Sequence, residues 1–130
     1  MILTLKTASM ETELGLVDRP GQQIDGELWQ SGRQLSEELL ERIKTLLKKH
    51  KLSFPDLTGI IVFEGPGSFT SLRIGLTVAN TMAYAQGLPI VGATGEDWLK
   101  DGLAKLPSAK PGDYVMPAYG AEANITKPKK

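Results

Sequence analysis

The residues best suited to chemistry lie in one stretch, Glu64 to Ser71, which reads Glu-Gly-Pro-Gly-Ser-Phe-Thr-Ser. The stretch follows an apolar run and precedes a helical pattern, so it predicts a turn that leads from a strand into a helix. Glycine permits the unusual dihedral angles of a tight turn, and a serine or threonine can cap the first N–H groups of the helix. Because those N–H groups and the helix dipole converge there, the turn could hold a phosphate or nucleotide through Gly65, Gly67, Ser68 and Thr70.

The same turn also fits a capped helix start that binds no ligand. No lysine follows the glycines, which excludes the phosphate loop of nucleotide hydrolases. Arg73 could bind a phosphate from the first turn of the helix, or it could form an ion pair with a local acid such as Glu64. The ion pair is the favoured interpretation of Arg73, and both interpretations of the turn stay open.

The sequence offers little else for catalysis or metal binding. A serine nucleophile needs a base and an orienting acid. The single histidine, His50, falls at the C-terminal end of a different predicted helix, where a solvated role is expected. Cysteine is absent, so disulfides and cysteine-bound metals are excluded. We therefore predict no catalytic residue, no metal and no cofactor.

Composition describes an ordinary globular domain. The chain has 130 residues, of which 41% are hydrophobic and 23% charged, and its formal net charge is zero. One domain is expected at this length, and a neutral chain gives no support for a dominant electrostatic grip on RNA or an acidic membrane. The apolar run at the N-terminus is too short for a signal peptide, and no apolar stretch approaches the roughly 20 residues that span a bilayer. A cytoplasmic location without membrane contact is predicted.

Hydrophobic periodicity predicts five strands. Three of them, over residues 2–6, 12–17 and 22–29, are joined by short turns and should form an antiparallel meander. A continuous apolar run over residues 58–63 predicts a fourth strand that is buried on both faces. Residues 89–92 form a short fifth strand.

Three helices are predicted between and after these strands. The first covers residues 35–50, with an apolar stripe along one side and Ser36 as its N-cap. The second follows the glycine-rich turn and stops before Gly87. The third extends from a Thr94 cap through Leu103. The predicted order is β-β-β-α-β-α-β-α, an α/β fold with a mixed five-stranded sheet.

The second helix is apolar over an unusually wide arc of roughly 200°, about twice what one packed face needs. Within the arc, Ser71, Gly75 and Ala79 recur every four residues and form a low ridge that another helix could approach closely. The first or third helix of the same domain could also fill that space. With the first helix included, the predicted partner-binding residues are Leu39, Ile43, Ser71, Leu72, Gly75, Leu76, Ala79 and Met82.

The run GPGSFTSLRIGL, from Gly65 to Leu76, is similar to the GPGSFTGLRIGL signature of the TsaB (YeaZ) family. Proteins of that family are subunits needed to make threonylcarbamoyladenosine (t6A) in tRNA. Three shorter segments also resemble family motifs: residues 35–40 the "HSExLL" helix start, residues 6–9 the "DTS" strand end, and residues 116–119 the C-terminal "P-x-Y-x-R" segment. The resemblance covers about residues 1–103.

The resemblance implies a ribonuclease H-like half-domain of the actin-like ATPase superfamily over residues 1–103. Residues 104–130 would be a remnant C-terminal segment with a basic tail, in a shortened form that lacks most of the second domain. Four positions depart from the family pattern. Lys6 stands where actin-like ATPases have aspartate, Leu35 where the family has histidine, Ser71 where it has glycine, and Gly120 where the tail motif has arginine.

The family resemblance further implies a non-catalytic scaffold subunit that pairs with a TsaD-like transferase through its helices. A TsaE-like ATPase is a possible further partner, and tRNA would be contacted only indirectly through the complex. A homodimer is possible when the partner is absent. The alternatives that remain are a phosphate- or nucleotide-binding module that uses the 64–71 turn, and a structural homodimer.

Overall fold

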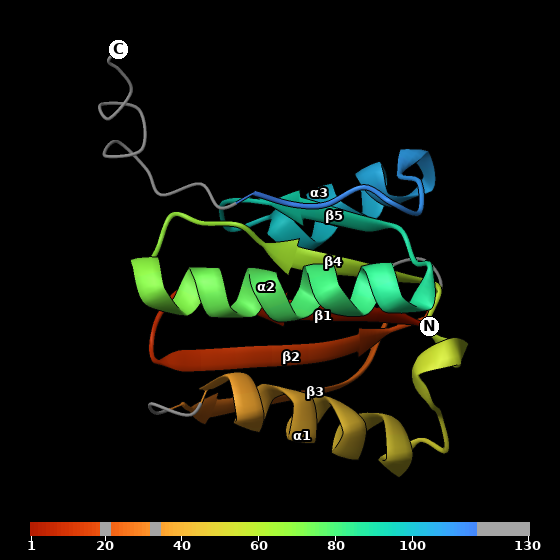
Figure 1. Ribbon diagram of the computed structural model, residues 1–130, viewed down its shortest axis with the longest axis horizontal. Helices are drawn as coiled ribbons and strands as arrows, with labels where there is room; N and C mark the ends of the chain where they lie inside the picture. The colour runs from red at the N-terminus through yellow and green to blue at the C-terminus, as the bar shows by residue number, and fades with distance from the viewer. Residues whose placement is uncertain (19–21, 32–34, 117–130) are drawn as a thin grey trace.

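The computed structural model describes residues 1–18, 22–31 and 35–116 and shows one mixed sheet with helices on both faces (Figure 1). The order across the sheet is β3-β2-β1-β4-β5, where the strands are β1 (Ile2–Lys6), β2 (Glu11–Val17), β3 (Gln23–Gln30), β4 (Gly59–Phe63) and β5 (Ile90–Ala93). β2 is antiparallel to both of its neighbours, whereas β4 is parallel to β1 and β5. The predicted meander and the predicted α/β fold class with a five-stranded mixed sheet are confirmed.

Three α-helices and two short 3₁₀ helices connect and follow the strands. They are α1 (Leu35–Lys49), η2 (Phe54–Asp56), α2 (Phe69–Gln86), α3 (Trp98–Lys105) and η3 (Leu106–Ser108). α1 and α2 cover one face of the sheet, and α3 covers the other face near β4 and β5 (Figure 1). The chain therefore has two apolar cores, one on each side of the sheet.

β4 lies between these two cores. All five of its residues are buried, as the continuous apolar run predicts for a strand covered on both faces. Ile60 and Val62 belong to the larger core under α1 and α2, whereas Ile61 and Phe63 belong to the core under α3. The turn that follows β4 therefore starts from a strand that is buried on both faces.

α1 follows the predicted amphipathic pattern with one difference at its start. Leu39, Ile43 and Leu46 are fully buried, acidic residues occupy the first turn and lysines the last. This charge order complements the helix dipole. The helix already begins at Leu35, so Ser36 lies inside its first turn and the predicted Ser36 cap is wrong. The apolar stripe extends one residue further toward the N-terminus because Leu35 itself is buried.

The end of α2 is confirmed, while the limits of α3 differ from the prediction. Gly87 adopts a left-handed conformation with φ of 65° and its N–H caps the last turn of α2. α3 begins at Trp98, not after Thr94, because Gly95 has φ of 83° and the chain turns through residues 94–97. The rings of Trp98 and Phe63 form a T-shaped pair with their centroids 5.7 Å apart, and this contact anchors the helix.

The C-terminal part of the described chain lies against the same body. α3 continues to Lys105, so the predicted domain boundary at residue 103 falls inside this helix. The chain then passes beside β5 (Figure 1), and Val115 is buried in the larger core. The predicted tail motif at Pro117 and Tyr119, and Gly120, lie outside the described residues. Among the helices of the described residues, none is long and apolar enough to cross a bilayer.

Candidate functional site

The glycine-rich turn joins β4 to α2 and packs closely against the chain that follows β1. Gly67 touches Ala8 so tightly that a Cβ at this position would lie 2.6 Å from the Ala8 carbonyl oxygen. The Ser68 N–H donates to that same oxygen at 2.7 Å. Gly65 has φ of 124°, a conformation that glycine adopts without a steric penalty. Packing and turn geometry therefore account for both glycines of the signature.

Ser68 is the N-cap of α2, where the sequence allowed either a serine or a threonine of the turn. Its hydroxyl oxygen accepts a hydrogen bond from the Ser71 N–H at 3.5 Å. Thr70 lies within the helix and is exposed. Two of the N–H groups that a phosphate would use are thus bonded within the protein, those of Ser68 and Ser71. The turn holds β1, β4 and α2 together, and its phosphate-binding interpretation stays a prediction.

The ridge of small residues on α2 faces the sheet. The Thr7 hydroxyl donates to the Ser71 carbonyl oxygen at 2.9 Å, and a Cβ at Gly75 would overlap that same hydroxyl. Ala79 is only 1% exposed and belongs to the larger core. The prediction that Ser71, Gly75 and Ala79 form a partner-facing ridge is wrong in this respect, because the end of β1 and the domain's own core occupy the space beside it.

The other predicted partner-binding residues show the same outcome. Their exposure does not exceed 7%, and it is zero for three of them; the five residues are Leu39, Ile43, Leu72, Leu76 and Met82. Leu72 lies among the core residues under α3, and the other four lie in the larger core. The wide apolar arc of α2 therefore serves mainly packing on two sides within the domain, and a partner could reach only its outer border, where Met82 lies.

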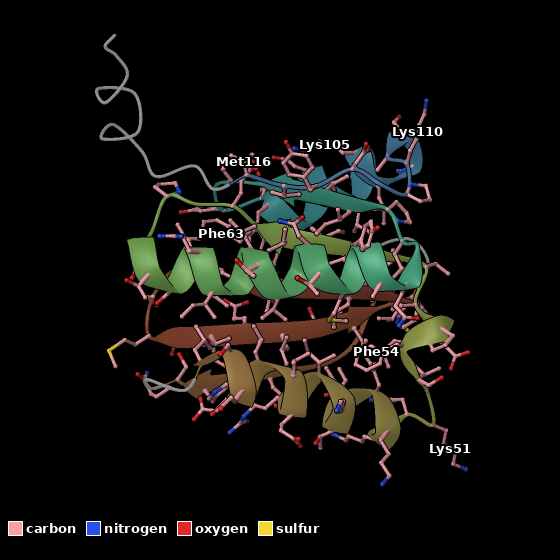
Figure 2. All side chains as sticks on the ribbon, in the orientation of Figure 1. Lys51, Phe54, Phe63, Lys105, Lys110 and Met116 are labelled. Carbon is pink, nitrogen blue, oxygen red and sulfur yellow. The ribbon has the colours of Figure 1, made fainter. Side chains whose placement is uncertain are left out.

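An apolar groove remains open on the outer side, between α1 and α2. It consists of two adjoining depressions of about 300 Å³ and 270 Å³, which share Thr77 and Val78. We call this the helical groove. Leu40 of α1 lines it and is 40% exposed, although it is a large hydrophobic residue. Figure 2 shows Phe54 at one end, between the C-terminal halves of the two helices.

Charged residues stand at the borders of this groove. Lys44 of α1 lines its C-terminal half, and Arg73 of α2 lines its N-terminal half. The apolar residues Ile74, Val78 and Met82 line the groove between them. A surface that is apolar in the centre and charged at the border has the organisation of a protein-binding site.

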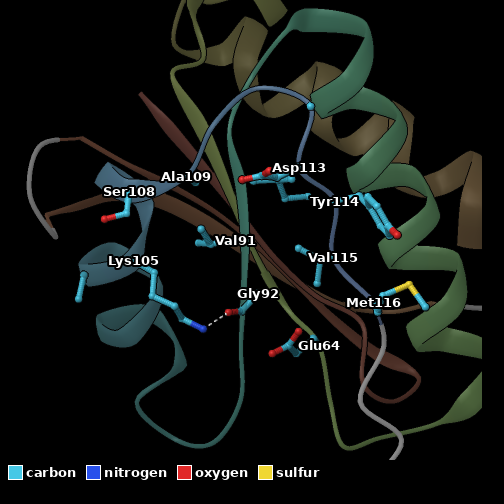
Figure 3. A pocket seen from close by; sticks show the side chains of 13 residues that line it. Glu64, Val91, Gly92, Lys105, Ser108, Ala109, Asp113, Tyr114, Val115 and Met116 are labelled. Carbon is cyan, nitrogen blue, oxygen red and sulfur yellow. Dashed lines mark hydrogen bonds between the residues drawn. The ribbon is translucent and has the colours of Figure 1, made fainter.

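A larger cavity lies elsewhere, along the outer edge of β5. It has a volume of about 760 Å³ and is bordered by α3 and η3 on one side and residues 112–116 on the other (Figure 3). Asn80 of α2 holds the second border in place. Its side-chain amide donates to the Val115 carbonyl and accepts from the Val115 N–H, each at 2.9 Å. Sequence reasoning missed this double hydrogen bond.

The lone histidine forms part of a charged cluster between α1 and β3. His50 Nε2 lies 2.8 Å from Asp25 Oδ2, and Lys49 Nζ lies 2.9 Å from the same oxygen. Hydrogen bonds from His50, then Lys49, hold the pKa of the Asp25 carboxyl well below its usual range. His50 is therefore paired, not simply solvated as predicted. The alternation of side chains along β3 could have indicated this pairing, because it places odd-numbered residues such as Asp25 on the side of α1.

Two polar side chains at or near the turn make structural contacts. The ammonium of Lys6, at the end of β1, lies 4.6 Å from the ring centre of Phe63, a cation–π contact. The Ser68 hydroxyl caps a helix. Within residues 1–18, 22–31 and 35–116, no group of three histidine, aspartate or glutamate side chains could hold a metal ion.

Comparison with known proteins identifies the family of this chain. A sequence model described as TsaD, tRNA N6-adenosine threonylcarbamoyltransferase, matches residues 30–97, more than half of the chain. A tRNA N6-adenosine threonylcarbamoyltransferase of Shouchella clausii is 40% identical over 50 residues, or 38% of this chain and 15% of that protein. An uncharacterized protein of Mycobacterium tuberculosis is 31% identical over 97 residues, or 74% of this chain and 46% of that protein. The chain thus spans less than half the length of these relatives.

Solved structures show the fold independently. YeaZ from Pseudomonas aeruginosa superposes with a TM-score of 0.65 at 24% identity, over 72% of this chain and 43% of that chain. RuvC of Thermus thermophilus, in complex with a Holliday junction substrate, gives a TM-score of 0.51 at 15% identity, over 94% and 86% of the two chains. Such neighbours place the sheet and helices in the ribonuclease H-like fold. From the match across residues 30–97, this chain belongs to the TsaD family, described as tRNA N6-adenosine threonylcarbamoyltransferase.

Proposed function

We propose that this chain is a non-catalytic protein-binding subunit in the formation of threonylcarbamoyladenosine on tRNA. In this role it binds a TsaD-like transferase through the helical groove. Membership of the TsaD family and the ribonuclease H-like fold support the assignment to this modification. The proposal requires no catalytic group from this chain, since its contribution is to hold the partner.

The open groove between α1 and α2 is the observation that carries the proposal. Packing within the domain covers the inner sides of both helices but leaves Leu40 and the outer side of α2 accessible. Apolar surface of this kind gains free energy when a partner removes it from water. A groove between two helices accepts the apolar face of a third helix, which is a common mode of recognition.

Shared ancestry supports the choice of partner. A TsaD-like protein belongs to the same family, so its corresponding region should have the same fold and present an equivalent pair of helices. Two such pairs can pack with the ridges of one in the groove of the other, as in a helix bundle. Lys44 at the border would then favour an acidic residue on the partner.

Co-expression with the TsaD-like protein of the same organism tests the proposal. Size-exclusion chromatography with light scattering should show a one-to-one heterodimer or a two-to-two assembly. The substitution Thr77→Arg places a charge where the two halves of the groove meet and removes no buried side chain. We expect it to weaken binding by at least about 30-fold, the effect of disturbing the centre of an interface.

Tyr84→Arg is the matched control. Tyr84 lies on the same helix and is 83% exposed, but it is not part of the groove. This variant should bind the partner as tightly as the unmodified chain. The proposal is wrong if Thr77→Arg also binds normally, or if the unmodified chain elutes as a homodimer and ignores the TsaD-like protein.

A further inference from the structure

We infer that the outer edge of β5 accepts an extended peptide strand from a partner protein, in the cavity between η3 and residues 112–116. β5 is the last strand of the sheet in the described residues, at the side opposite β3. The cavity of about 760 Å³ lies directly along it (Figure 3). This site is separate from the helical groove, and the inference does not depend on the proposed function.

The hydrogen-bond pattern of β5 leaves polar groups directed outward. The Pro89 carbonyl oxygen accepts from the Ile60 N–H, and the Ala93 carbonyl oxygen accepts from the Glu64 N–H, each at 3.0 Å. The main-chain groups of odd-numbered β5 residues are therefore directed toward β4. In a parallel ladder the intervening residues, Ile90 and Gly92, direct both N–H and C=O away from that neighbour. Of these four outward groups, only the Gly92 carbonyl has a partner among the residues that the structure describes, the Lys105 ammonium.

Such an edge is a template for strand addition. Unpaired N–H and C=O groups at the edge of a sheet bind an extended chain through main-chain hydrogen bonds. Their burial makes this more favourable, since buried main-chain groups without partners are costly. Ile90 is only 2% exposed and Gly92 is buried.

The shape of the site selects a single extended strand. α3 and η3 stand on one side of the edge, and the segment held by Asn80 stands on the other (Figure 3). A second copy of this chain would bring the same two borders to its own β5 edge, so the borders of the two copies would meet before their strands could pair. One extended segment can enter between them.

Lys105 supplies a charge for recognition. A lysine at a sheet edge hinders unwanted pairing, and this one occupies the Gly92 carbonyl. An incoming N–H would replace the ammonium at that oxygen, and an acidic side chain on the same strand would then pair with the released ammonium. The expected occupant is therefore an extended segment with small or β-branched residues and one acid.

Disulfide tethering tests the inference, because the chain contains no cysteine. Ser108→Cys provides a single thiol at an exposed position on the border of the cavity. The probe is a peptide with a terminal cysteine, a glycine spacer and the sequence Val-Thr-Val-Glu-Val. We expect the tethered peptide to slow hydrogen exchange of the Gly92 or Ile90 amide by about tenfold or more. The Val91 amide, which faces β4, should not change.

Two controls determine the outcome. The same peptide with N-methyl groups at alternate residues has identical side chains but cannot donate along one edge, so it should give no protection. Lys105→Met removes the competing donor at the Gly92 carbonyl but also the partner of the peptide's glutamate. It should therefore increase protection by the peptide Val-Thr-Val-Thr-Val, which has no acid. Unchanged exchange at Gly92 and Ile90 with the unmethylated peptide would overturn the inference. So would protection that appears without peptide and rises with protein concentration, because that would show pairing between two copies.

Discussion

On its inner side α2 presents Ser71, Gly75 and Ala79 to the end of β1 and the core, whereas on its outer side Thr77 and Thr81 face the helical groove. Both sides carry small residues. The inner side is closed by contacts and a hydrogen bond from Thr7, and the outer side is open. Small residues on a helix therefore identify a close approach, but the fold decides whether the approaching element belongs to the same chain.

The largest effect is expected from Gly75→Leu. A side chain at this position would overlap Thr7, so the variant must separate α2 from β1 or distort both. We expect a loss in the free energy of unfolding of about 3 kcal/mol, at the upper end of what overpacking costs. Urea denaturation of the isolated chain measures it. If the ridge faced a partner, as predicted from the sequence, the isolated Gly75→Leu chain would keep its stability.

Ala85→Leu is the comparison for this substitution. It adds a similar volume on the same helix, but Ala85 is exposed and lines the helical groove. Its effect on the free energy of unfolding should stay within about 0.5 kcal/mol. Equal stability of the two variants would show that the inner side of α2 is as open as the outer side, contrary to the structure.

A smaller loss of stability is expected from Asn80→Ala, which removes the hydrogen bonds between α2 and the segment around Val115. This variant leaves the N–H and C=O of the buried Val115 without partners. The expected cost in the free energy of unfolding is about 1–2 kcal/mol, and cleavage by chymotrypsin at the neighbouring exposed Tyr114 should become faster. Asn80→Asp keeps an acceptor for the Val115 N–H only, so its stability should lie between those of Asn80→Ala and the unmodified chain. Cleavage at an unchanged rate in Asn80→Ala would mean that residues 113–116 are held by other contacts.

Elements that depend on local pattern could be predicted from the sequence. The apolar run of β4 and the alternation of the first strands determine which side of each strand is buried. The Ser68 cap and the Gly87 stop involve only neighbouring residues. The Thr94 cap failed because Gly95 permits a turn with positive φ, and the Ser36 cap failed because a buried Leu35 extends the helix.

Contacts between distant residues could not be predicted in the same way. Asn80 and Val115 are 35 residues apart, and Asp25 and His50 are 25 apart, so no periodicity relates them. The ridge on α2 was predicted as a feature but assigned to the wrong neighbour, because the sequence does not show that Thr7 occupies the space beside Gly75. The helical groove is what remains after such contacts are made, so it becomes visible only in the folded chain.

The smallest effect concerns the charged cluster that joins α1 to β3. Since hydrogen bonds from His50 and Lys49 lower the pKa of Asp25 from its ordinary value of 3.8, the folded state favours the ionised carboxylate. The ionised Asp25 carboxylate stabilises the folded state fully above pH values near 3.8. This stability is lost as the pH falls through the lower pKa of the folded state. Urea midpoints at neutral pH and at several values below about pH 4 measure the loss.

Asp25→Asn should remove this contribution, so its midpoint should lie below that of the unmodified chain at neutral pH and change less on acidification. The two curves should approach each other as the pH falls, because protonation of Asp25 breaks the same contacts as the substitution. Asp101→Asn, which changes an exposed aspartate of α3, should instead run parallel to the unmodified chain. Curves for Asp25→Asn that stay parallel at all pH values would mean that the hydrogen bonds between β3 and the end of α1 do not persist in solution. That junction would then be open, like the outer side of α2.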